Sequence, residues 1–209
     1  RDITKLFSDN YKVSGGRLEL LNWMSGYYGL PVGELVPLFH PPSPGTKSRK
    51  SRIDSVEMIL TDPTDITLTD EQESALDIAV EHIDQNKFGT LLLHGITGSG
   101  KTEVYLQIIA HALKQDKSAI LLLPEIALTP QTEARIRQRF GDKVGTLHSG
   151  LSNGQRCMVH EKAASGELKV IVGPRSALFV PLRNLGAIIV DEEHETTYKQ
   201  EDKPRYHAR

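Results

Sequence analysis

The sequence predicts an α/β fold in which a doubly wound, mostly parallel sheet carries a nucleotide-binding loop. Three observations lead to this prediction. Short apolar runs recur from residue 91 to residue 190, and helical periodicity separates most of them. A glycine-rich turn of the form GxxxxGK(S/T) occupies residues 95–102. An acidic cluster, residues 191–193, directly follows the last apolar run.

The apolar runs are expected to be strands of one sheet, because continuous apolar character is typical of strands covered on both faces. The expected strands are 91–94, 119–123, 144–147, 169–172 and 187–190, and the helices between them are 101–114, 130–140 and 153–164. In such sheets ligands bind at the carboxyl ends of the strands. Residues that follow a strand are therefore the first candidates for function.

A helix is expected to precede the first of these strands. Thr69 fits the N-cap position and Gln72 the third helical position of a capping box, and the helical pattern ends near residues 86–87. This helix is expected to begin a domain that we place at residues 66–209.

The remaining N-terminal residues divide into two parts. Residues 1–45 form a small, partly helical segment, with helices expected at 17–28 and 32–39. This pattern fits part of a winged helix, and it fits equally two helices docked on the next domain. Residues 46–65 are expected to be a basic linker rich in Pro and Ser with a short strand at 53–60, either solvated or touching a phosphate backbone.

Composition limits the classes of protein that fit. The 209 residues are 38% apolar and 25% charged, which is typical of a globular domain, and the formal net charge of −2 gives no overall attraction to nucleic acid. Cys157 is the single cysteine, which excludes an internal disulfide and a cysteine-based zinc site within this chain. No apolar run is long enough for a membrane span, and the start of the chain has no signal-peptide core, so we expect no membrane partner and a cytoplasmic location. The first residue is Arg1 rather than Met, which leads us to expect a fragment.

The glycine-rich turn is the strongest functional motif. A triphosphate requires close approach of the backbone and inward-pointing N–H groups, which glycines and a helix N-terminus provide. We expect the whole turn to bind ATP: Gly95, Ile96, Thr97, Gly98, Ser99, Gly100, Lys101 and Thr102. Lys101 is expected to reach the β- and γ-phosphates, and Thr102 to bind Mg²⁺. The alternative is a merely structural glycine-rich loop.

The acidic cluster is the second motif. Asp191 and Glu192 follow an apolar run, so both are expected at a carboxyl end of the sheet. Asp191 is suited to bind Mg²⁺ and Glu192 to orient and deprotonate a water molecule. Together with Lys101 they form the expected catalytic set. The alternative is a solvated acidic turn.

The two motifs together resemble the first motor lobe of superfamily 2 DExH helicases. Five blocks in order (97–105, 124–131, 147–151, 173–181 and 191–209) resemble the PriA family of bacterial replication-restart helicases over most of residues 66–209, and residues 27–36 resemble the end of that family's winged-helix region. The resemblance implies a RecA-like lobe of an ATP-dependent 3′-to-5′ DNA helicase that takes part in primosome assembly at stalled forks. It also implies ATP and Mg²⁺ as cofactors, and as partners single-stranded and forked DNA, primosome proteins and single-strand-binding protein. The zinc of full-length relatives is held by cysteine pairs that this chain lacks.

The resemblance assigns roles to further residues. Gln72 matches a glutamine that contacts adenine, a role that competes with its capping-box role. Thr129, Gln131, Arg175 and Ser176 match motifs that grip a single DNA strand, although Thr129 also fits an ordinary N-cap. His194, Tyr198 and Tyr206 match positions that couple DNA binding to the ATP site, and a structural role is the alternative for His194. Lys203 and Pro204 stand where some relatives carry a tryptophan, which puts base stacking there in doubt.

Several alternatives and ordinary residues complete the expectations. The chain alone is expected to lack full activity, because these motors need a second lobe. Another superfamily 2 DNA translocase, or a nucleotide-binding interaction module without turnover, would share the same motifs. We expect Arg135 and Arg139 on the exposed face of their helix, and Trp23 and Cys157 to be packing residues.

Overall fold

The structure is a computed structural model that describes residues 15–40, 67–96 and 98–209. Its helices are α1 (Gly15–Tyr28), α2 (Val32–Phe39), α3 (Asp70–Asp84), α4 (Lys101–Lys114), α5 (Pro130–Phe140) and α6 (Asn153–Ser165), with short 3₁₀ turns η3 (Glu125–Ala127), η4 (Gly141–Lys143), η5 (Arg175–Phe179) and η6 (Thr196–Tyr198). These bounds confirm the expected helices to within about two residues at each end. The strand expected at 53–60 lies outside the described residues.

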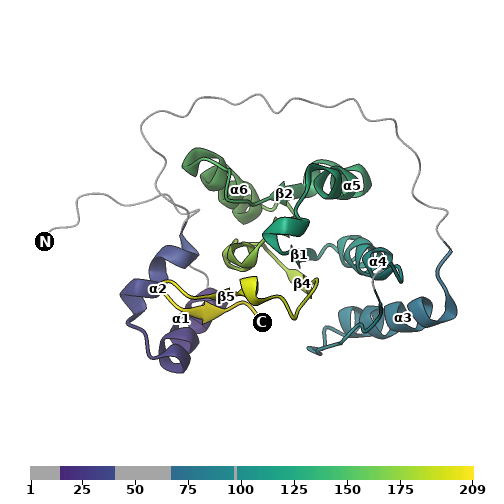
Figure 1. Cartoon of the computed structure of the whole chain (residues 1–209), viewed down its shortest axis with the longest axis horizontal. Helices are drawn as coiled ribbons and strands as arrows, with labels where there is room; N and C mark the ends of the chain where they lie inside the picture. Colours follow the sequence, from purple (N-terminus) through teal and green to yellow (C-terminus); the bar gives the residue numbers. More distant parts are fainter. Residues whose placement is uncertain (1–14, 41–66, 97) are drawn as a thin grey trace, which may run out of the picture.

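A parallel sheet forms the centre of the domain (Figure 1). Its strands are β1 (Ser118–Leu122), β2 (Val144–Thr146), β3 (Val170–Gly173) and β4 (Leu185–Val190), in the order β2-β3-β1-β4. All three strand pairs are parallel, which confirms the predicted α/β fold with a mostly parallel sheet. A two-stranded antiparallel ribbon, β5 (Lys199–Gln200) with β6 (Tyr206–His207), was not predicted.

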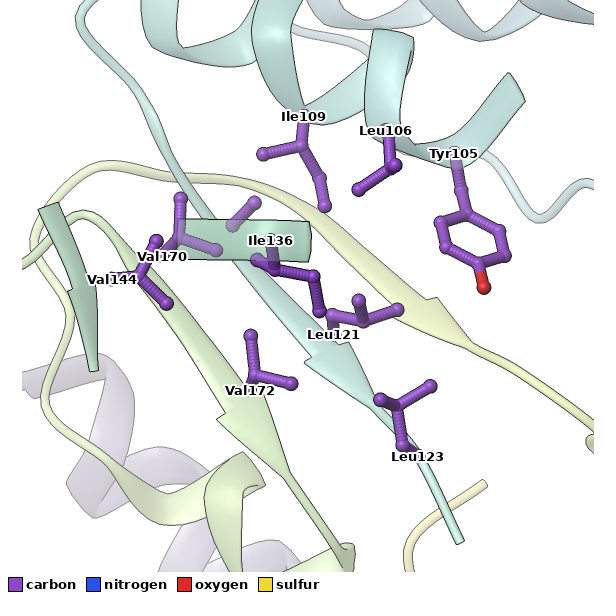
Figure 2. Close-up of a cluster of buried hydrophobic side chains, with 10 residues drawn as sticks. Tyr105, Leu106, Ile109, Leu121, Leu123, Ile136, Val144, Val170 and Val172 are labelled. Atoms are coloured by element: carbon purple, nitrogen blue, oxygen red, sulfur yellow. The ribbon is translucent and has the colours of Figure 1, made fainter. Parts of the chain in front are cut away.

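Helices cover both faces of the sheet, as continuous apolar strands predict. Successive residues of a strand point to opposite faces, so β1 supplies Leu121 to one apolar cluster and Ile120 to the other. The first cluster packs against α4 and α5 through Leu106, Ile109 and Ile136, as Figure 2 shows. The second packs against α6 and η5. Every residue of β1, β2 and β3 is buried.

The helix starts follow from local capping. Thr69 and Gln72 form the predicted capping box at the start of α3. Thr129 accepts a hydrogen bond from the N–H of Thr132, and Pro130 occupies the first turn of α5, where its missing N–H has no cost. The first cap fixes the start of α3 beside the loop motif, and the second fixes the start of α5 at the carboxyl side of the sheet.

The N-terminal helices pack on the domain. Leu35 and Phe39 share a buried cluster with Phe179 and Tyr206, and purple α1 and α2 lie beside the yellow C-terminal ribbon in Figure 1. This is the docked arrangement that the sequence left as one of two alternatives, and the winged-helix assignment stays a prediction. Trp23 stacks on Tyr27, as a packing residue would, but it is 56% exposed and lies outside the buried core. Cys157 is buried as expected.

One predicted strand is absent. Residues 91–94 form no ladder, and Leu92 is 78% exposed, so the prediction of a strand there is wrong for this structure. The run lies away from the sheet, although an edge of β4 is open to it. Of the described strands only β1 neighbours β4, and nothing pairs with the other edge of β4.

Candidate nucleotide-binding site

The loop motif leads into α4 at the side of the domain next to α3. Gly98 and Gly100 have φ angles of 81° and 79°, a region that side-chain-bearing residues rarely adopt. A Cβ on Gly95 would lie 2.6 Å from the Ser99 hydroxyl oxygen, so a side chain there would displace the Ser99 side chain. The backbone can therefore approach a ligand closely, and the N-terminus of α4 offers unpaired N–H groups to an anion. Thr97 lies outside the described residues.

Lys101 folds back over the loop. Its ammonium group donates to the carbonyl oxygens of Gly95 (2.7 Å) and Ile96 (3.1 Å). A cation held at the loop centre by two neutral carbonyls can exchange them for phosphate oxygens, which form stronger, charge-assisted hydrogen bonds. The loop residues and Lys101 therefore fit a phosphate group.

Gln72 performs two functions at once. Its side-chain oxygen accepts from the N–H of Thr69 (3.0 Å), which completes the capping box. Its amide nitrogen donates to the carbonyl oxygen of Ser99 (2.8 Å), which ties α3 to the loop. A Cβ on Gly100 would lie 2.4 Å from that nitrogen, so the contact is close. The predicted adenine contact would require this amide to leave Ser99.

Asp191 stands at the end of β4 and is fixed through both its backbone and its side chain. Its N–H donates to the carbonyl of Leu122, and its own carbonyl accepts from the Tyr198 hydroxyl at 2.6 Å. The carboxylate accepts from the N–H of Glu192 at 3.1 Å and from the Tyr105 hydroxyl at 3.1 Å. Two hydrogen bonds thus hold the backbone of Asp191 and two more orient its carboxylate.

The two predicted metal-binding residues come together through Tyr105. The Tyr105 hydroxyl lies 3.1 Å from the Thr102 hydroxyl oxygen and 3.1 Å from an Asp191 carboxylate oxygen. Thr102 and Asp191 are far apart in sequence, and the fold brings both within hydrogen-bonding distance of this one hydroxyl. Hydroxyl and carboxylate oxygens are the ligands that Mg²⁺ prefers, so this donor set fits that ion.

Glu192 lies beside this pair in an unusual backbone conformation. Its φ angle is 46°, a left-handed value that costs a non-glycine residue about 1–2 kcal/mol. Its carboxylate lies 3.7 Å from the His194 ring, and the His194 side chain is 74% exposed. His194 is therefore not a buried structural histidine, and its predicted coupling role stays a prediction.

The residues predicted to bind DNA follow two neighbouring strands, β1 and β3. Thr129 and Gln131 are exposed at the start of α5, and Ser176 is exposed in η5. A surface cavity of about 320 Å³, lined by Glu125, Leu128, Pro130, Glu133, His148 and Ser149, lies beside Thr129 and includes no loop-motif residue. These positions are consistent with a surface separate from the nucleotide loop.

Arg175 connects the DNA-binding candidates to the coupling candidates. Its guanidinium donates to the carbonyls of Thr197 (2.8 Å) and Lys199 (2.9 Å), the residues on either side of Tyr198. Tyr198 and Tyr206 are buried, at 1% and 3% exposure, so neither ring offers a face to a DNA base in this structure. Burial raises the pKa of Tyr206 to about 12.

Sequence reasoning missed two groups at the site. Tyr105 lies three residues after Thr102, on the same face of α4, a spacing that could have indicated its contact. Glu103 is buried and its carboxylate binds Arg139 at 2.6 Å, so the expectation that Arg139 lies on an exposed face is wrong. Arg135 is 55% exposed, as expected.

Two absences concern only the described residues. No helix among them has the length and apolar character that a membrane crossing requires. Nor does that part of the chain contain a group of three or more His, Cys, Asp or Glu side chains placed to hold a metal ion.

Comparison with known proteins supports the motif-based resemblance. A family model described as type III restriction enzyme, res subunit, matches residues 65–208. Replication restart protein PriA of Bacillus subtilis is 51% identical over 144 residues, which are 69% of this chain and 18% of that protein. The protein of the same name from Chlamydia pneumoniae is 53% identical over 70% of this chain and 20% of its own length. That of Helicobacter pylori J99 is 42% identical over 92% of this chain and 29% of its own length.

The chain therefore spans less than a third of these curated relatives. The predicted resemblance to PriA is confirmed, and the parallel α/β sheet is consistent with the RecA-like lobe that it implies. The chain belongs to the family whose model is described as type III restriction enzyme, res subunit, and it is similar to one segment of replication restart protein PriA.

Proposed function

We propose that this chain is the ATP-binding lobe of a DNA helicase that acts in replication restart, and that the full-length protein moves 3′ to 5′ along DNA. The observation that carries the proposal is the meeting of Thr102, in the loop motif, with Asp191, at the end of β4. Nucleotide hydrolysis requires a phosphate-binding loop and a metal-binding carboxylate at one place. The chain is similar to PriA, whose name refers to replication restart, and from this similarity we infer that the hydrolysis serves work on DNA.

The chain's own groups divide the work of hydrolysis. When bound, ATP supplies the phosphoryl group that passes to water, and Mg²⁺ neutralises charge on its oxygens. Lys101, which donates to two loop carbonyls, would exchange them for phosphate oxygens. Thr102 and Asp191 would hold the metal ion, and Glu192, next to Asp191 and partly exposed, would orient the water and accept its proton.

Binding of DNA is assigned to Thr129, Gln131, Arg175 and Ser176, which would contact phosphates and so act on any sequence. Such contacts suit single-stranded and forked DNA, and primosome proteins and single-strand-binding protein are the proposed partners. Arg175 and Tyr198 supply a physical route for coupling. If Arg175 turned toward a phosphate, it would release the carbonyls that flank Tyr198, the residue whose hydroxyl holds Asp191. His194, beside Glu192, and Tyr206 are the further coupling candidates.

Two substitutions in the full-length protein test the proposal. Lys101→Ala should abolish DNA-stimulated ATP hydrolysis and strand unwinding, because the phosphates lose their cation. Glu192→Gln should leave ATP binding unchanged and lower turnover by about a hundredfold or more, since a general base contributes that much. Lys114→Ala, in the last turn of α4, is the control and should retain both activities. Unwinding by the Lys101→Ala protein would refute the function, and normal turnover by Glu192→Gln would remove Glu192 as the base.

The 209-residue chain by itself is proposed to bind nucleotide weakly and to hydrolyse it negligibly. Motors of this kind close a second lobe over the nucleotide and supply an arginine to the γ-phosphate, a contribution of about a thousandfold or more. Strong DNA-stimulated phosphate release by the isolated chain would contradict this proposal.

A second candidate function is a DNA translocase of the restriction type, which the description of the matching family favours. Such a motor would share the lobe and hydrolyse ATP on DNA without unwinding a fork. Fork unwinding by the full-length protein distinguishes the two. A nucleotide-binding module without turnover is the third possibility, and it predicts no hydrolysis even by the unsubstituted protein.

A further inference from the structure

The Tyr105 hydroxyl occupies a position between the two proposed metal ligands. It lies 3.1 Å from the Thr102 hydroxyl and 3.1 Å from Asp191 Oδ2, and in the described part of the chain it alone hydrogen-bonds to both. Tyr105 and Thr102 share one face of α4, whereas Asp191 comes from the end of β4. The hydroxyl therefore joins the helix that carries the loop to the strand that carries the acidic pair.

Counting protons fixes the direction of these hydrogen bonds. A phenol has a single proton, and an ionised carboxylate can only accept, so Tyr105 must donate to Asp191. The Thr102 hydroxyl then donates to the Tyr105 oxygen. In this arrangement the Thr102 proton is engaged with Tyr105, and the lone pairs of the Thr102 oxygen are left for a cation.

The ring of Tyr105 is held firmly, so the hydroxyl has little freedom. The residue is 7% exposed and belongs to the apolar cluster with Leu106, Ile109 and Leu121. Figure 2 shows the ring beside Leu106, with its oxygen at the outer edge of the group of labelled side chains. A tyrosine hydroxyl ordinarily carries its proton at neutral pH, so it can donate a hydrogen bond.

We propose that Tyr105 is a positioning residue for the metal ion of the nucleotide site: its hydroxyl orients the Thr102 oxygen and the Asp191 carboxylate so that both face one Mg²⁺. This inference rests on the proposed ATP-binding function. It differs from a purely structural role, in which the hydroxyl would only satisfy its own hydrogen bonds and metal affinity would not depend on it. Groups that hydrogen-bond to metal ligands commonly change metal affinity by about ten- to a hundredfold when removed.

The test is Tyr105→Phe in the full-length protein, because phenylalanine keeps the ring and its packing. Binding of a fluorescent ATP analogue is titrated with Mg²⁺ and, separately, measured with the metal chelated. We expect the Mg²⁺ concentration for half-maximal enhancement of binding to rise about tenfold, while metal-free nucleotide affinity and the melting temperature stay close to those of the unsubstituted protein.

A matched control is Tyr28→Phe. This substitution also removes a tyrosine hydroxyl that holds another segment, since Tyr28 accepts from the N–H of His207 at 3.1 Å, but it lies outside the nucleotide site. It should leave the Mg²⁺ dependence unchanged. An unchanged Mg²⁺ dependence in Tyr105→Phe, with normal nucleotide binding by the unsubstituted protein, would overturn the positioning role alone. Absence of nucleotide binding by the unsubstituted protein would instead overturn the proposed function.

Discussion

Two regions of this domain contain similar apolar residues and place them differently. In the packed region (β1, β3 and helices α4–α6), Leu121 is 0% exposed, whereas in the loop region (residues 88–100) Leu92 is 78% exposed. The difference lies in the neighbours. β1 has a strand on each side and apolar clusters on both faces, and residues 91–96 pair with no described strand. An apolar run is buried only where the topology supplies a surface to bury it against.

The largest expected effect comes from a matched pair of leucines. Leu121→Ala should lower the free energy of unfolding by about 2–5 kcal/mol, because it leaves a cavity in a close-packed core. Leu92→Ala should change it by less than about 0.5 kcal/mol, as is usual for surface positions. Urea unfolding followed by circular dichroism and by fluorescence measures both.

The same two leucine variants can contradict the assignment of Leu92 to an exposed loop region. A loss at Leu92 that approaches the loss at Leu121 would mean that residues 91–94 are buried. The strand that the sequence predicts there would then be restored, with the free edge of β4 as the available place for it.

The next effect concerns the buried ion pair beside the loop motif. Arg139→Ala should lower the free energy of unfolding by about 3 kcal/mol, because it leaves the Glu103 carboxylate buried without its close cation. Arg135→Ala is the control. The Arg135 side chain is 55% exposed and its guanidinium lies 3.8 Å from Glu103, so its removal should cost less than about 1 kcal/mol. Equal losses for the two variants would contradict the placement of Arg139 in the packed region.

The folding stability of the packed region should depend on pH through His160, a buried residue of α6. Burial, followed by the charges of Arg17, His40 and Arg156, lowers the pKa of His160 from 6.5 to about 4. A lowered pKa means that the folded protein favours neutral His160. The contribution of His160 to folding stability is therefore complete above about pH 6.5, the pKa in the unfolded chain, and is lost as the pH falls from about 6.5 to 4. The total loss is about 3 kcal/mol. Unfolding of His160→Gln should lack this part of the pH dependence, and a curve that matches the unsubstituted protein would contradict the assignment.

The contrast also explains which parts of the fold could be predicted. β1 and β3 were predicted because residues 119–123 and 170–172 are unbroken apolar runs, and both strands are buried in the structure. α4 and α5 were predicted to the residue, because Gly100 and Thr129 end the preceding segments. The short 3₁₀ turns and the two-residue strands β5 and β6 have no periodic pattern to detect, since they depend on contacts with distant segments.

The candidate site was predictable where its chemistry is local. Lys101, Thr102 and Asp191 belong to short motifs with a mechanistic reason for each residue. The bond between Glu103 and Arg139 joins two helices, and a single sequence gives no measure of their distance. Tyr105 is intermediate, because its spacing from Thr102 is local and its contact with Asp191 is not.

The smallest effect separates the two functions of Gln72 at the border of the loop region. Gln72→Glu keeps an oxygen for the Thr69 N–H, as in the usual capping box, but has no amide to donate to Ser99. The free energy of unfolding should change by less than about 0.5 kcal/mol, because negative charge is favourable at a helix N-terminus. Nucleotide affinity should fall about fivefold, the effect of one hydrogen bond that no longer orders the loop. If ATP and GTP lose affinity equally, Gln72 acts through Ser99; a loss confined to ATP would show that it contacts adenine, and no loss for either would leave it a helix cap alone.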